Sequence, residues 1–297
     1  MSSVRWQRRV TCPAKINLGL WVLGQRADSF HALASLVVQT QWGDDLEMTW
    51  HAEAGLDRLK CDVPDLPTDE RNLIIKACRL FRDRHALEGH AVFRLDKRVP
   101  WGGGLGGGSA NGAWALRLLN EAHGHPSTPA ELHELAAELG SDVPLFLWDA
   151  PVWMRGRGEE IEAVEAALAE RLRRLAVTIA HPGFPVETLW AYRELAARQA
   201  YSSASQVEDA VQHWHQAQLP SLEAFHNDFR AVVDCKYPTI PVVLDALGEV
   251  EGIRAQLSGS GSACFAIYEE ASRAGAVERV IREAWGNSAF VVHTQMR

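Results

Sequence analysis

Six glycines occupy seven consecutive positions in the stretch WGGGLGGGS, Trp101–Ser109, and an apolar helical pattern follows directly. Backbone N–H groups at a helix N-terminus lack intrahelical partners and bind phosphate, and the helix dipole adds positive potential there. Glycines allow the backbone to close on phosphate oxygens. The stretch therefore predicts a phosphate-binding loop over Gly102–Ser109.

This loop differs from two common nucleotide-binding motifs. A GxxxxGK[ST] loop carries its own lysine, whereas Gly102–Ser109 contains none. A GxGxxG pattern is present at Gly102, Gly104 and Gly107, but a helix-cap sequence, GHPSTPAEL, stands where a dinucleotide fold needs an acidic residue. A flexible linker is disfavoured because a strand pattern precedes the loop and a helix follows it. The positive charge and the base must therefore come from elsewhere in the chain.

Three other stretches supply such residues. PAKINL places Lys15 and Asn17 in an early strand, LGSDVP places Asp142 just after a helix end, and LSGSGSACFA forms a second small-residue loop at Ser258–Ser262. Singly, these fit a solvent-facing lysine, a turn aspartate and a tight hairpin. Their occurrence together with the glycine loop favours a catalytic site.

Two His-x-His pairs have spacing that could suit a metal. They are His123 with His125 and His213 with His215. Both lie in polar turn or helix contexts, and no cysteine or carboxylate stands nearby at ligand spacing. We therefore expect no metal at either pair.

Hydrophobic periodicity predicts the elements that must position these residues. The predicted strands cover 9–24, 35–50 (a pair joined at Gly43), 90–100, 143–159 (a pair around Asp149 and Ala150), 175–182, 254–268 (a pair around the small-residue loop) and 289–295. The predicted helices cover 72–84, 109–120, 129–139, 188–198, 221–234, 240–247 and 271–285. Thr128 and Glu131 form a capping-box signature at the third of these helices. The irregular alternation of strands and helices indicates an α+β fold.

Composition limits the classes that remain. The chain has 297 residues, 47% hydrophobic and 23% charged, which suits a globular protein of two domains, divided here at a composition change into 1–157 and 158–297. It contains neither an 18-residue apolar run nor a signal-peptide pattern, so we expect a cytoplasmic protein without a membrane partner. The net charge of −8 argues against a nucleic-acid partner, and the five scattered cysteines predict reduced thiols. The oligomeric state is not indicated.

The motifs PAKINL, PWGGGLGGGSANGA, GSDVP and SGSGS together resemble the GHMP kinase superfamily. Within it they resemble the 4-diphosphocytidyl-2-C-methyl-D-erythritol kinases of the non-mevalonate isoprenoid pathway. GGGLGGGS, KINL and a turn with Asp28, Phe30 and His31 are specific to that subfamily. The resemblance covers most of the chain, through HPG at 181–183 and HND at 226–228. It implies a fold of two α+β domains with the active site in the cleft between them.

The resemblance also implies residue roles. ATP would transfer its γ-phosphoryl group to the tertiary 2-hydroxyl of the methylerythritol unit, with Asp142 as the base and Lys15 orienting it and stabilising charge. Such a reaction needs positioning and electrostatic stabilisation more than covalent help. Mg²⁺ would accompany ATP, on protein ligands that the sequence does not identify. The implied ATP-binding residues are Pro100, Gly102, Gly103, Gly104, Leu105, Gly106, Gly107, Gly108, Ser109 and Asn111. The implied substrate-binding residues are Asn17, Phe30, His31, Tyr192, Ser258, Gly259, Ser260 and Gly261.

The cytosine would stack between Phe30 and Tyr192 and be recognised at its polar edge by His31. The subfamily sequence GYHEL reads SFHAL here, which places Ser29 at a glycine position and Ala32 at a glutamate position. Phe30 can still stack, because stacking requires a ring face and not a hydroxyl group. GGGSS reads GGGSA, which leaves the hydroxyl of Ser109 alone for phosphate or Mg²⁺.

Two alternatives remain. Another small-molecule kinase of the superfamily, for homoserine or mevalonate, is disfavoured because the Phe30–His31 pair and GGGLGGGS are not the pattern of those enzymes. A non-catalytic nucleotide-binding protein on the same fold should have lost Lys15 or Asp142, and both are present.

Overall fold

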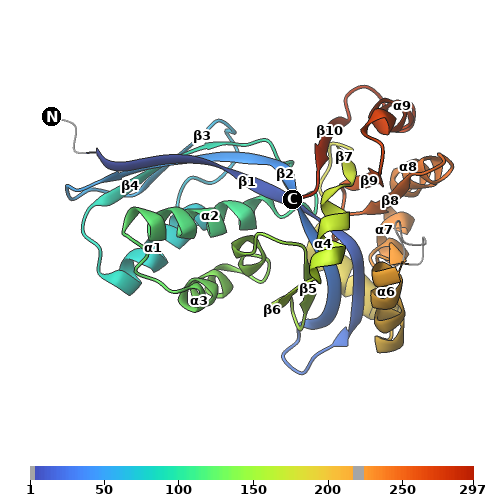
Figure 1. The fold of residues 1–297 in the computed structure, drawn as a ribbon, viewed down its shortest axis with the longest axis horizontal. Coiled ribbons are helices and arrows are strands. Elements are labelled where there is room, and N and C mark those ends of the chain that lie inside the picture. Colours follow the sequence, from blue (N-terminus) through green and yellow to red (C-terminus); the bar gives the residue numbers. More distant parts are fainter. Residues whose placement is uncertain (1–3, 217–223) are drawn as a thin grey trace. The chain divides into compact units, whose positions relative to one another are not determined.

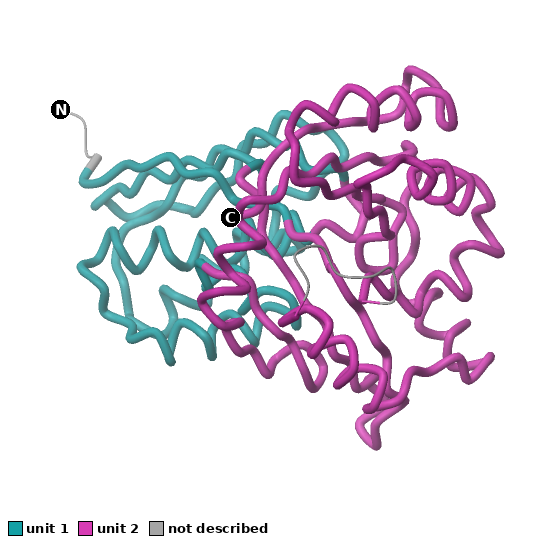
Figure 2. Tube along the Cα trace, turned by 45° about the vertical axis from the view of Figure 1, so that its right-hand side comes forward, with its two compact units in different colours: residues 1–14, 42–100, 106–149 teal, residues 15–41, 101–105, 150–297 magenta. Residues whose placement is uncertain are grey.

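A computed structural model describes residues 4–216 and 224–297, which fall into two compact units (Figure 2). Unit 1 comprises the described residues within 1–14, 42–100 and 106–149, and unit 2 comprises those within 15–41, 101–105 and 150–297. Two strands, β1 (Val4–Gln25) and β2 (His31–His51), contribute residues to both units. A single division at residue 157 assigns 15–41, 101–105 and 150–157 to the N-terminal half, whereas by compactness they belong with unit 2.

Unit 1 combines strands with a layer of helices. Strand β4 (His90–Asp96) pairs antiparallel with β2 and parallel with β3 (Arg58–Cys61), while β1 pairs with β2. Ala91, Phe93 and Leu95 alternate along β4 and are all buried, as expected for a strand with one core face. The helices pack on one another beneath these strands in Figure 1: α1 (Leu73–His85), α2 (Gly107–Ala122), α3 (Pro129–Leu139) and the 3₁₀ helix η1 (Pro144–Leu147).

Two of these helices begin at caps that can be recognised in the sequence. The Asn72 side chain accepts the Ile74 N–H at the start of α1. The predicted capping box of α3 is confirmed, because Thr128 accepts the Glu131 N–H while the Glu131 carboxylate accepts the Thr128 N–H. Such a cap contributes about 1 kcal/mol to helix stability.

Unit 2 contains a second, antiparallel sheet with the strand order β10–β7–β9–β8. Every residue of β7 and β9 is buried, which explains why their sequences are apolar runs rather than alternating patterns. The four strands are β7 (Ala176–His181), β8 (Arg254–Leu257), β9 (Cys264–Tyr268) and β10 (Phe290–Gln295).

The remaining elements of unit 2 surround this sheet and the β2 segment. Strand β5 (Val152–Arg155) pairs antiparallel with β2 at residues 35–37 and with β6 (Glu160–Ala163). Helices α8 and α9 contact the four-stranded sheet. The helices are α4 (Ala166–Arg173), α5 (Thr188–Arg198), α6 (Ala204–Gln216), α7 (Arg230–Lys236), α8 (Thr239–Gly248), the 3₁₀ helix η3 (Ala271–Arg273) and α9 (Ala274–Trp285).

Two strand predictions are wrong. Residues 35–50 belong to one continuous strand, β2, and Gly43 makes no turn. A Cβ at Gly43 would lie 1.8 Å from the Cys12 carbonyl oxygen, so this glycine permits a close approach of β1 and β2. The first half of 143–159 forms η1, because Pro144 is suited to a helix start and a short apolar run does not distinguish a strand from a buried helix.

Other predictions need smaller corrections. The predicted strand 90–100 ends at Asp96. The predicted helix 221–234 begins outside the described residues at 221–223, and within the described part it starts only at Arg230. Helices α4 and α6 lie outside the predicted elements, and each buries only three residues, so its apolar pattern is short.

The five cysteines are free thiols. Burial raises the pKa of Cys12, Cys78 and Cys264, so these three thiols stay protonated and unreactive at neutral pH. Cys61 in β3 is half-buried, and Cys235 in α7 is exposed. Across residues 4–216 and 224–297, no helix is both long enough and apolar enough to cross a lipid bilayer.

Candidate active site

The first half of the glycine run packs against the small-residue loop of unit 2. Gly102 and Gly104 have φ values of +70° and +75°, a conformation that side chains strain. A Cβ at Gly104 would lie 2.1 Å from the Ser258 carbonyl oxygen. The Ser258 hydroxyl donates to the Gly104 carbonyl at 3.0 Å, and the Ala263 N–H donates to the Gly103 carbonyl at 3.1 Å. Only glycine therefore fits at Gly104.

Lys15 and Asn17 lie beside these two loops. The Lys15 N–H donates to the Leu105 carbonyl at 2.9 Å, which joins β1 to the glycine run. The Lys15 ammonium donates to the Asn17 side-chain oxygen, and a Cβ at Gly259 would lie 3.2 Å from Lys15 Nζ. The Asn17 amide in turn donates to the Ser35 hydroxyl at 2.8 Å. The side chain is buried, and its amino group lies beside the backbone of the loop at Ser258–Ser262.

Asn227 holds the small-residue loop in place. Its side-chain amide donates to the carbonyl oxygens of Leu257 at 2.8 Å and Gly259 at 2.9 Å, and its backbone forms a bridge with Leu20 of β1. The sequence pointed to the HND stretch without assigning this residue a role. The geometry makes Asn227 a positioning residue for the loop at Ser258–Ser262.

His181 ends β7 beneath the glycine run. A Cβ at Gly103 would lie 3.4 Å from its Nε2. The Gly183 N–H donates to Nδ1 at 3.2 Å, which places the proton of the neutral ring on Nε2. Burial lowers the pKa of His181, and Nε2 has no hydrogen-bond partner among the described residues. A neutral donor therefore adjoins the loop.

The second half of the glycine run opens helix α2 in unit 1. Gly106 is the N-cap with φ +70° and provides no side-chain cap, so the first-turn N–H groups are not bound by a cap residue. A Cβ at Gly107 would lie 2.8 Å from Lys97 Nζ, while a Cβ at Gly108 would meet nothing within 4 Å. The open space at Gly108 and the uncapped N–H groups suit a phosphate group.

A buried polar cluster supports this helix start. The Asn111 amide donates to Asp44 Oδ2 at 3.0 Å, and Lys97 pairs with the same carboxylate. Asp44 Oδ1 also accepts the Arg98 and Val99 N–H groups at 2.7 and 2.8 Å. Asn111, expected to bind ATP, thus uses its amide to fix α2 to Asp44 of β2, whose carboxylate also holds the backbone that follows β4.

Asp142 lies in the turn between α3 and η1. Gly140 ends α3, and the Val143 N–H donates to the Gly140 carbonyl at 3.1 Å, which closes the turn. The Asp142 side chain is half-buried. Among the described residues of unit 1, none hydrogen-bonds or ion-pairs with its carboxylate.

The aromatic residues expected to bind cytosine are all in unit 2, in an arrangement that differs from the expected sandwich. Phe30 is 51% exposed, and the Arg157 guanidinium lies over its ring at 4.9 Å. His31 stacks on Tyr192, with ring centroids 4.8 Å apart and planes 24° apart. Burial lowers the pKa of His31, which keeps its ring neutral at pH 7. Tyr192 is held edge-on by Phe229 at 4.8 Å.

The backbone conformation at Ser29 explains why the subfamily has a glycine at this position. Its φ is +68°, in the left-handed region that glycine adopts most easily. The Asp28 carboxylate accepts the Phe30 N–H at 3.1 Å, and the Arg26 N–H donates to the Phe30 carbonyl at 2.7 Å. Ser29 therefore keeps the turn at a conformational cost. Nothing in the structure explains the replacement at Ala32.

Comparison with known proteins agrees with the family that the sequence motifs indicate. Residues 72–150 match the model of the GHMP kinases N terminal domain, and residues 207–287 match that of the GHMP kinases C terminal. A 4-diphosphocytidyl-2-C-methyl-D-erythritol kinase of Chlorobium phaeobacteroides (strain BS1) is 38% identical over 274 residues, which cover 91% of this chain and 92% of the relative. The chain belongs to this family of GHMP kinases. A second kinase of that name, from Chlorobaculum tepidum, is 38% identical over 267 residues. These residues cover 89% of this chain and 90% of the relative.

Solved structures of GHMP kinases share the α+β fold. A crystal structure of 4-(cytidine 5'-diphospho)-2C-methyl-D-erythritol kinase matches with a TM-score of 0.78 and 27% identity, covering 97% of this chain and 99% of that one. Homoserine kinase from Cytophaga hutchinsonii matches with a TM-score of 0.71 at 17% identity, covering 95% of each chain, and shows the fold alone. The predicted α+β GHMP kinase fold is confirmed.

One pocket of this GHMP kinase was not predicted from the sequence. It has a volume of about 600 Å³ and lies in unit 2, between the start of α6 and the HND stretch. Asp228 at its wall accepts the Ser202 hydroxyl at 2.9 Å and the Val22 N–H at 2.6 Å, and it also pairs with His226. These bonds give Asp228 a structural role that joins β1 to the segment before α7.

Proposed function

We propose that the chain is an ATP-dependent kinase that phosphorylates the 2-hydroxyl of 4-diphosphocytidyl-2-C-methyl-D-erythritol in the non-mevalonate isoprenoid pathway. The observation that carries the proposal is the packing of Lys15 and Asn17 against the glycine run and the loop at Ser258–Ser262. The identity of 38% to curated kinases of that name supports the choice of acceptor.

Each half of the glycine run has a part in the proposed reaction. Gly102–Leu105 are fixed by the small-residue loop, and the uncapped N–H groups that follow Gly106 would bind the phosphates of ATP. Lys15 would stabilise the charge on the transferring group from its place beside Gly259. The open space at Gly108 is compatible with a bound phosphate.

The chemical step balances with Asp142 as the base. The acceptor hydroxyl oxygen forms a bond to the γ-phosphorus, the bond from that phosphorus to the β,γ-bridging oxygen breaks, and ADP leaves with the electron pair. The hydroxyl proton passes to the Asp142 carboxylate, which has no structural partner within the described part of unit 1. General-base help of this kind contributes about 10²–10⁴-fold to rate.

Mg²⁺ is proposed to accompany ATP. Bound with ATP, it would neutralise charge that develops on the phosphates during the transfer. The Ser109 hydroxyl in the first turn of α2 is the one side-chain oxygen of the loop that could contact the metal or a phosphate oxygen.

The cytidine half of the substrate is proposed to bind at Phe30, His31 and Tyr192. Because His31 stacks on Tyr192 in the structure, an entering cytosine must either displace this ring from Tyr192 or stack on its outer side. Phe30, exposed at the hairpin tip, offers a second ring face. We also propose a cytoplasmic location and no nucleic-acid or membrane partner, in keeping with a small-molecule substrate.

A panel of acceptors tests the proposal. The purified chain is incubated with ATP and Mg²⁺ and with 4-diphosphocytidyl-2-C-methyl-D-erythritol, homoserine, mevalonate or galactose, and ³¹P NMR follows ADP and the new phosphoester. Phosphorylation of the cytidine-linked alcohol alone is expected. Preferential turnover of another alcohol would assign a different GHMP kinase activity, and ATP binding without any turnover would contradict a catalytic role.

A further inference from the structure

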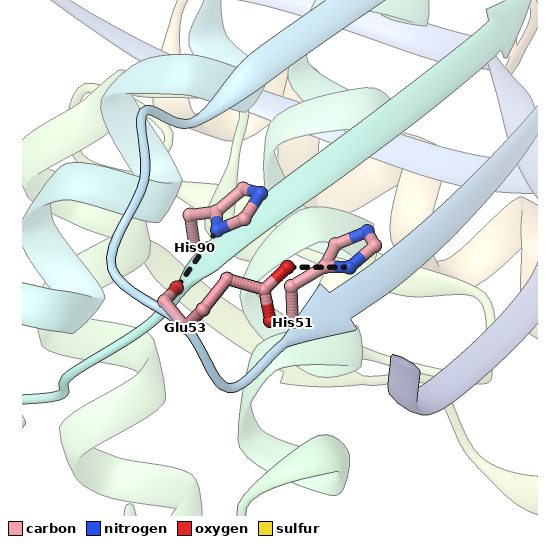
Figure 3. Close-up of side chains that lie close together, drawn as sticks. All are labelled: His51, Glu53 and His90. Carbon is pink, nitrogen blue, oxygen red and sulfur yellow. Dashed lines mark hydrogen bonds and ion pairs between the residues drawn. The ribbon is translucent and has the colours of Figure 1, made fainter. Parts of the chain in front are cut away.

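Two histidines and a glutamate lie together at the end of the unit 1 strands, and none of them is a residue of the candidate active site (Figure 3). His51 is the last residue of β2 and His90 the first of β4, and the two are direct partners in the antiparallel register. Glu53 follows His51 by two residues, just beyond the strand. The register places the two imidazole side chains next to each other, and the bend that follows β2 brings the Glu53 side chain to them.

The donor atoms of these side chains are close to one another. One ligand atom from each residue lies within 4.8 Å of the other two. His51 Nδ1 is 3.7 Å from Glu53 Oε1, and the two imidazole rings stack with centroids 4.7 Å apart and planes 9° apart. Side-chain rotations of modest size can therefore direct three donors to one point.

His90 already has the tautomer that a metal ligand needs. Its Nδ1 lies 3.0 Å from the Glu53 backbone carbonyl and donates to it, because a carbonyl oxygen only accepts. The Nε2 lone pair is then available, and Figure 3 shows Nε2 at the edge of the ring away from this hydrogen bond. Histidine ligands of metals commonly donate their other N–H to a backbone carbonyl, which fixes the ring and raises its basicity.

Two glycines make room for this arrangement. A Cβ at Gly55 would lie 2.5 Å from His90 Nδ1, so a side chain there would displace the ring. Gly89, directly before His90, has a φ of +98°, and a Cβ there would lie 2.4 Å from the His51 carbonyl oxygen. The backbone on both sides of the cluster thus depends on residues without side chains.

From this geometry we infer a binding site for a divalent transition-metal ion of the Zn²⁺ class, formed by His51, Glu53 and His90. Two imidazole nitrogens and one carboxylate oxygen suit Zn²⁺, Co²⁺ or Ni²⁺, whereas Mg²⁺ and Ca²⁺ prefer oxygen ligands. Water completes the coordination, because the side chains of His51 and Glu53 are 21% and 50% exposed. The two rings tilt out of their parallel stack on binding, since their in-plane lone pairs must meet at the ion.

The bound ion would connect the end of β2 to the start of β4 and to the loop beyond Glu53. A ligand that binds the folded state alone raises the unfolding temperature as its concentration rises. The site is therefore a structural clip for unit 1, and its existence does not depend on the proposed kinase activity.

Zinc titration of the metal-stripped full chain tests the inference. Isothermal titration calorimetry is run with Zn²⁺ alone on wild type, His51→Ala, Glu53→Gln and His90→Ala, with circular dichroism to establish folding. We expect one Zn²⁺ per wild-type chain and a loss of affinity of at least about tenfold in each variant. His213→Ala, which removes a histidine of α6 in unit 2, is the matched control and should bind like wild type.

Gly55→Ala sharpens the test, because it keeps all three ligands and displaces the His90 ring. A weaker zinc affinity in this variant supports the site geometry. Zinc affinity unchanged in the His51, Glu53 and His90 variants, no zinc binding by wild type, or equal loss in His213→Ala would each overturn the inference. Displacement of the zinc by millimolar Mg²⁺ would overturn the assigned metal class.

Discussion

The glycine run and the tip of the β1–β2 hairpin are built in different ways. Around Gly104, backbone atoms of the small-residue loop leave no space for a side chain, and the glycine run contributes only main-chain atoms to the hydrogen bonds between the two loops. At the hairpin tip, Phe30 is half exposed and its neighbours are side chains. A site formed by backbone tolerates no added atoms, whereas one formed by ring faces tolerates exchange of one ring for another, as Phe30 for tyrosine.

The largest expected effect is on the chemical step, at Asp142 and Lys15. Asp142→Asn keeps the shape but cannot accept the hydroxyl proton, so single-turnover rates should fall about 10²–10⁴-fold while ATP still binds. The single-turnover rate of Lys15→Met should fall by a comparable factor. The double variant should lose much less than the product of the two effects if the residues act on one group.

Asp149→Asn is the control for that series, because Asp149 is in the same unit and pairs with Arg117 on the surface. Its rate should equal that of wild type. Multiplicative losses in the double variant, or near wild-type turnover in Asp142→Asn, would remove the pair from the proposed chemistry.

The next largest effect is expected at Gly104. Gly104→Ala places a Cβ 2.1 Å from the Ser258 carbonyl at a φ of +75°, so the two loops must separate. Backbone strain of this kind costs about 1–3 kcal/mol, and the forced contact adds to it. We expect a lower unfolding free energy in urea and weaker ATP binding by calorimetry.

Gly108→Ala is the matched control for Gly104, because a Cβ there meets nothing within 4 Å. It should fold like wild type, and any loss of ATP affinity would then reflect phosphate contact alone. Equal stability of the Gly104 and Gly108 variants would contradict the tight packing of the two loops.

A smaller effect is expected on substrate binding at the aromatic residues of the proposed cytidine site. Tyr192→Ala and Phe30→Ala should each weaken binding of the cytidine substrate by about 1–3 kcal/mol, by analogy with other base-stacking sites. The apparent KM for that substrate should rise while the KM for ATP stays constant. If both variants keep wild-type substrate affinity, the cytosine binds elsewhere.

The smallest effect is expected at Ser29. Ser29→Gly relieves the strain of the left-handed conformation at φ +68°, but it also raises the conformational entropy of the unfolded chain. We therefore expect a gain in unfolding free energy of at most about 1 kcal/mol. Ser141→Gly, in a turn of unit 1 without a positive φ, should instead be neutral or destabilising. A clear loss of stability in Ser29→Gly would show that its side chain stabilises the turn.

Local chemistry made much of this fold predictable. The capping box at Thr128, the helix over 188–198 and the two strands on either side of the loop at Ser258–Ser262 depend on short-range interactions that a sequence pattern records. The turn predicted at Gly43 is wrong because a glycine that permits close contact between strands cannot be distinguished in the sequence from a glycine that makes a turn. The pattern of one strand does not show which backbone passes over it.

The site was predictable in its residue types more than in its contacts. Motif spacing selected Lys15, Asn17 and the glycine run, and in unit 2 the structure brings the two side chains together with the first half of that run, Gly102–Leu105. It did not select Asn227, whose hydrogen bonds to a loop 30 residues further along the chain arise only on folding. The stacking of His31 on Tyr192 likewise depends on two segments that are distant in sequence.

The distribution of thiols offers a spectroscopic use of the natural chain. Three of the five are buried and protonated, so a maleimide dye can reach only Cys61 and Cys235 without unfolding the protein. One lies in unit 1 and the other in unit 2. Burial raises the pKa of Cys61, so Cys235 should react first and the two dyes can be attached in sequence. Donor and acceptor fluorophores at these positions would report by energy transfer, without any mutation, whether nucleotide changes the separation of the two units.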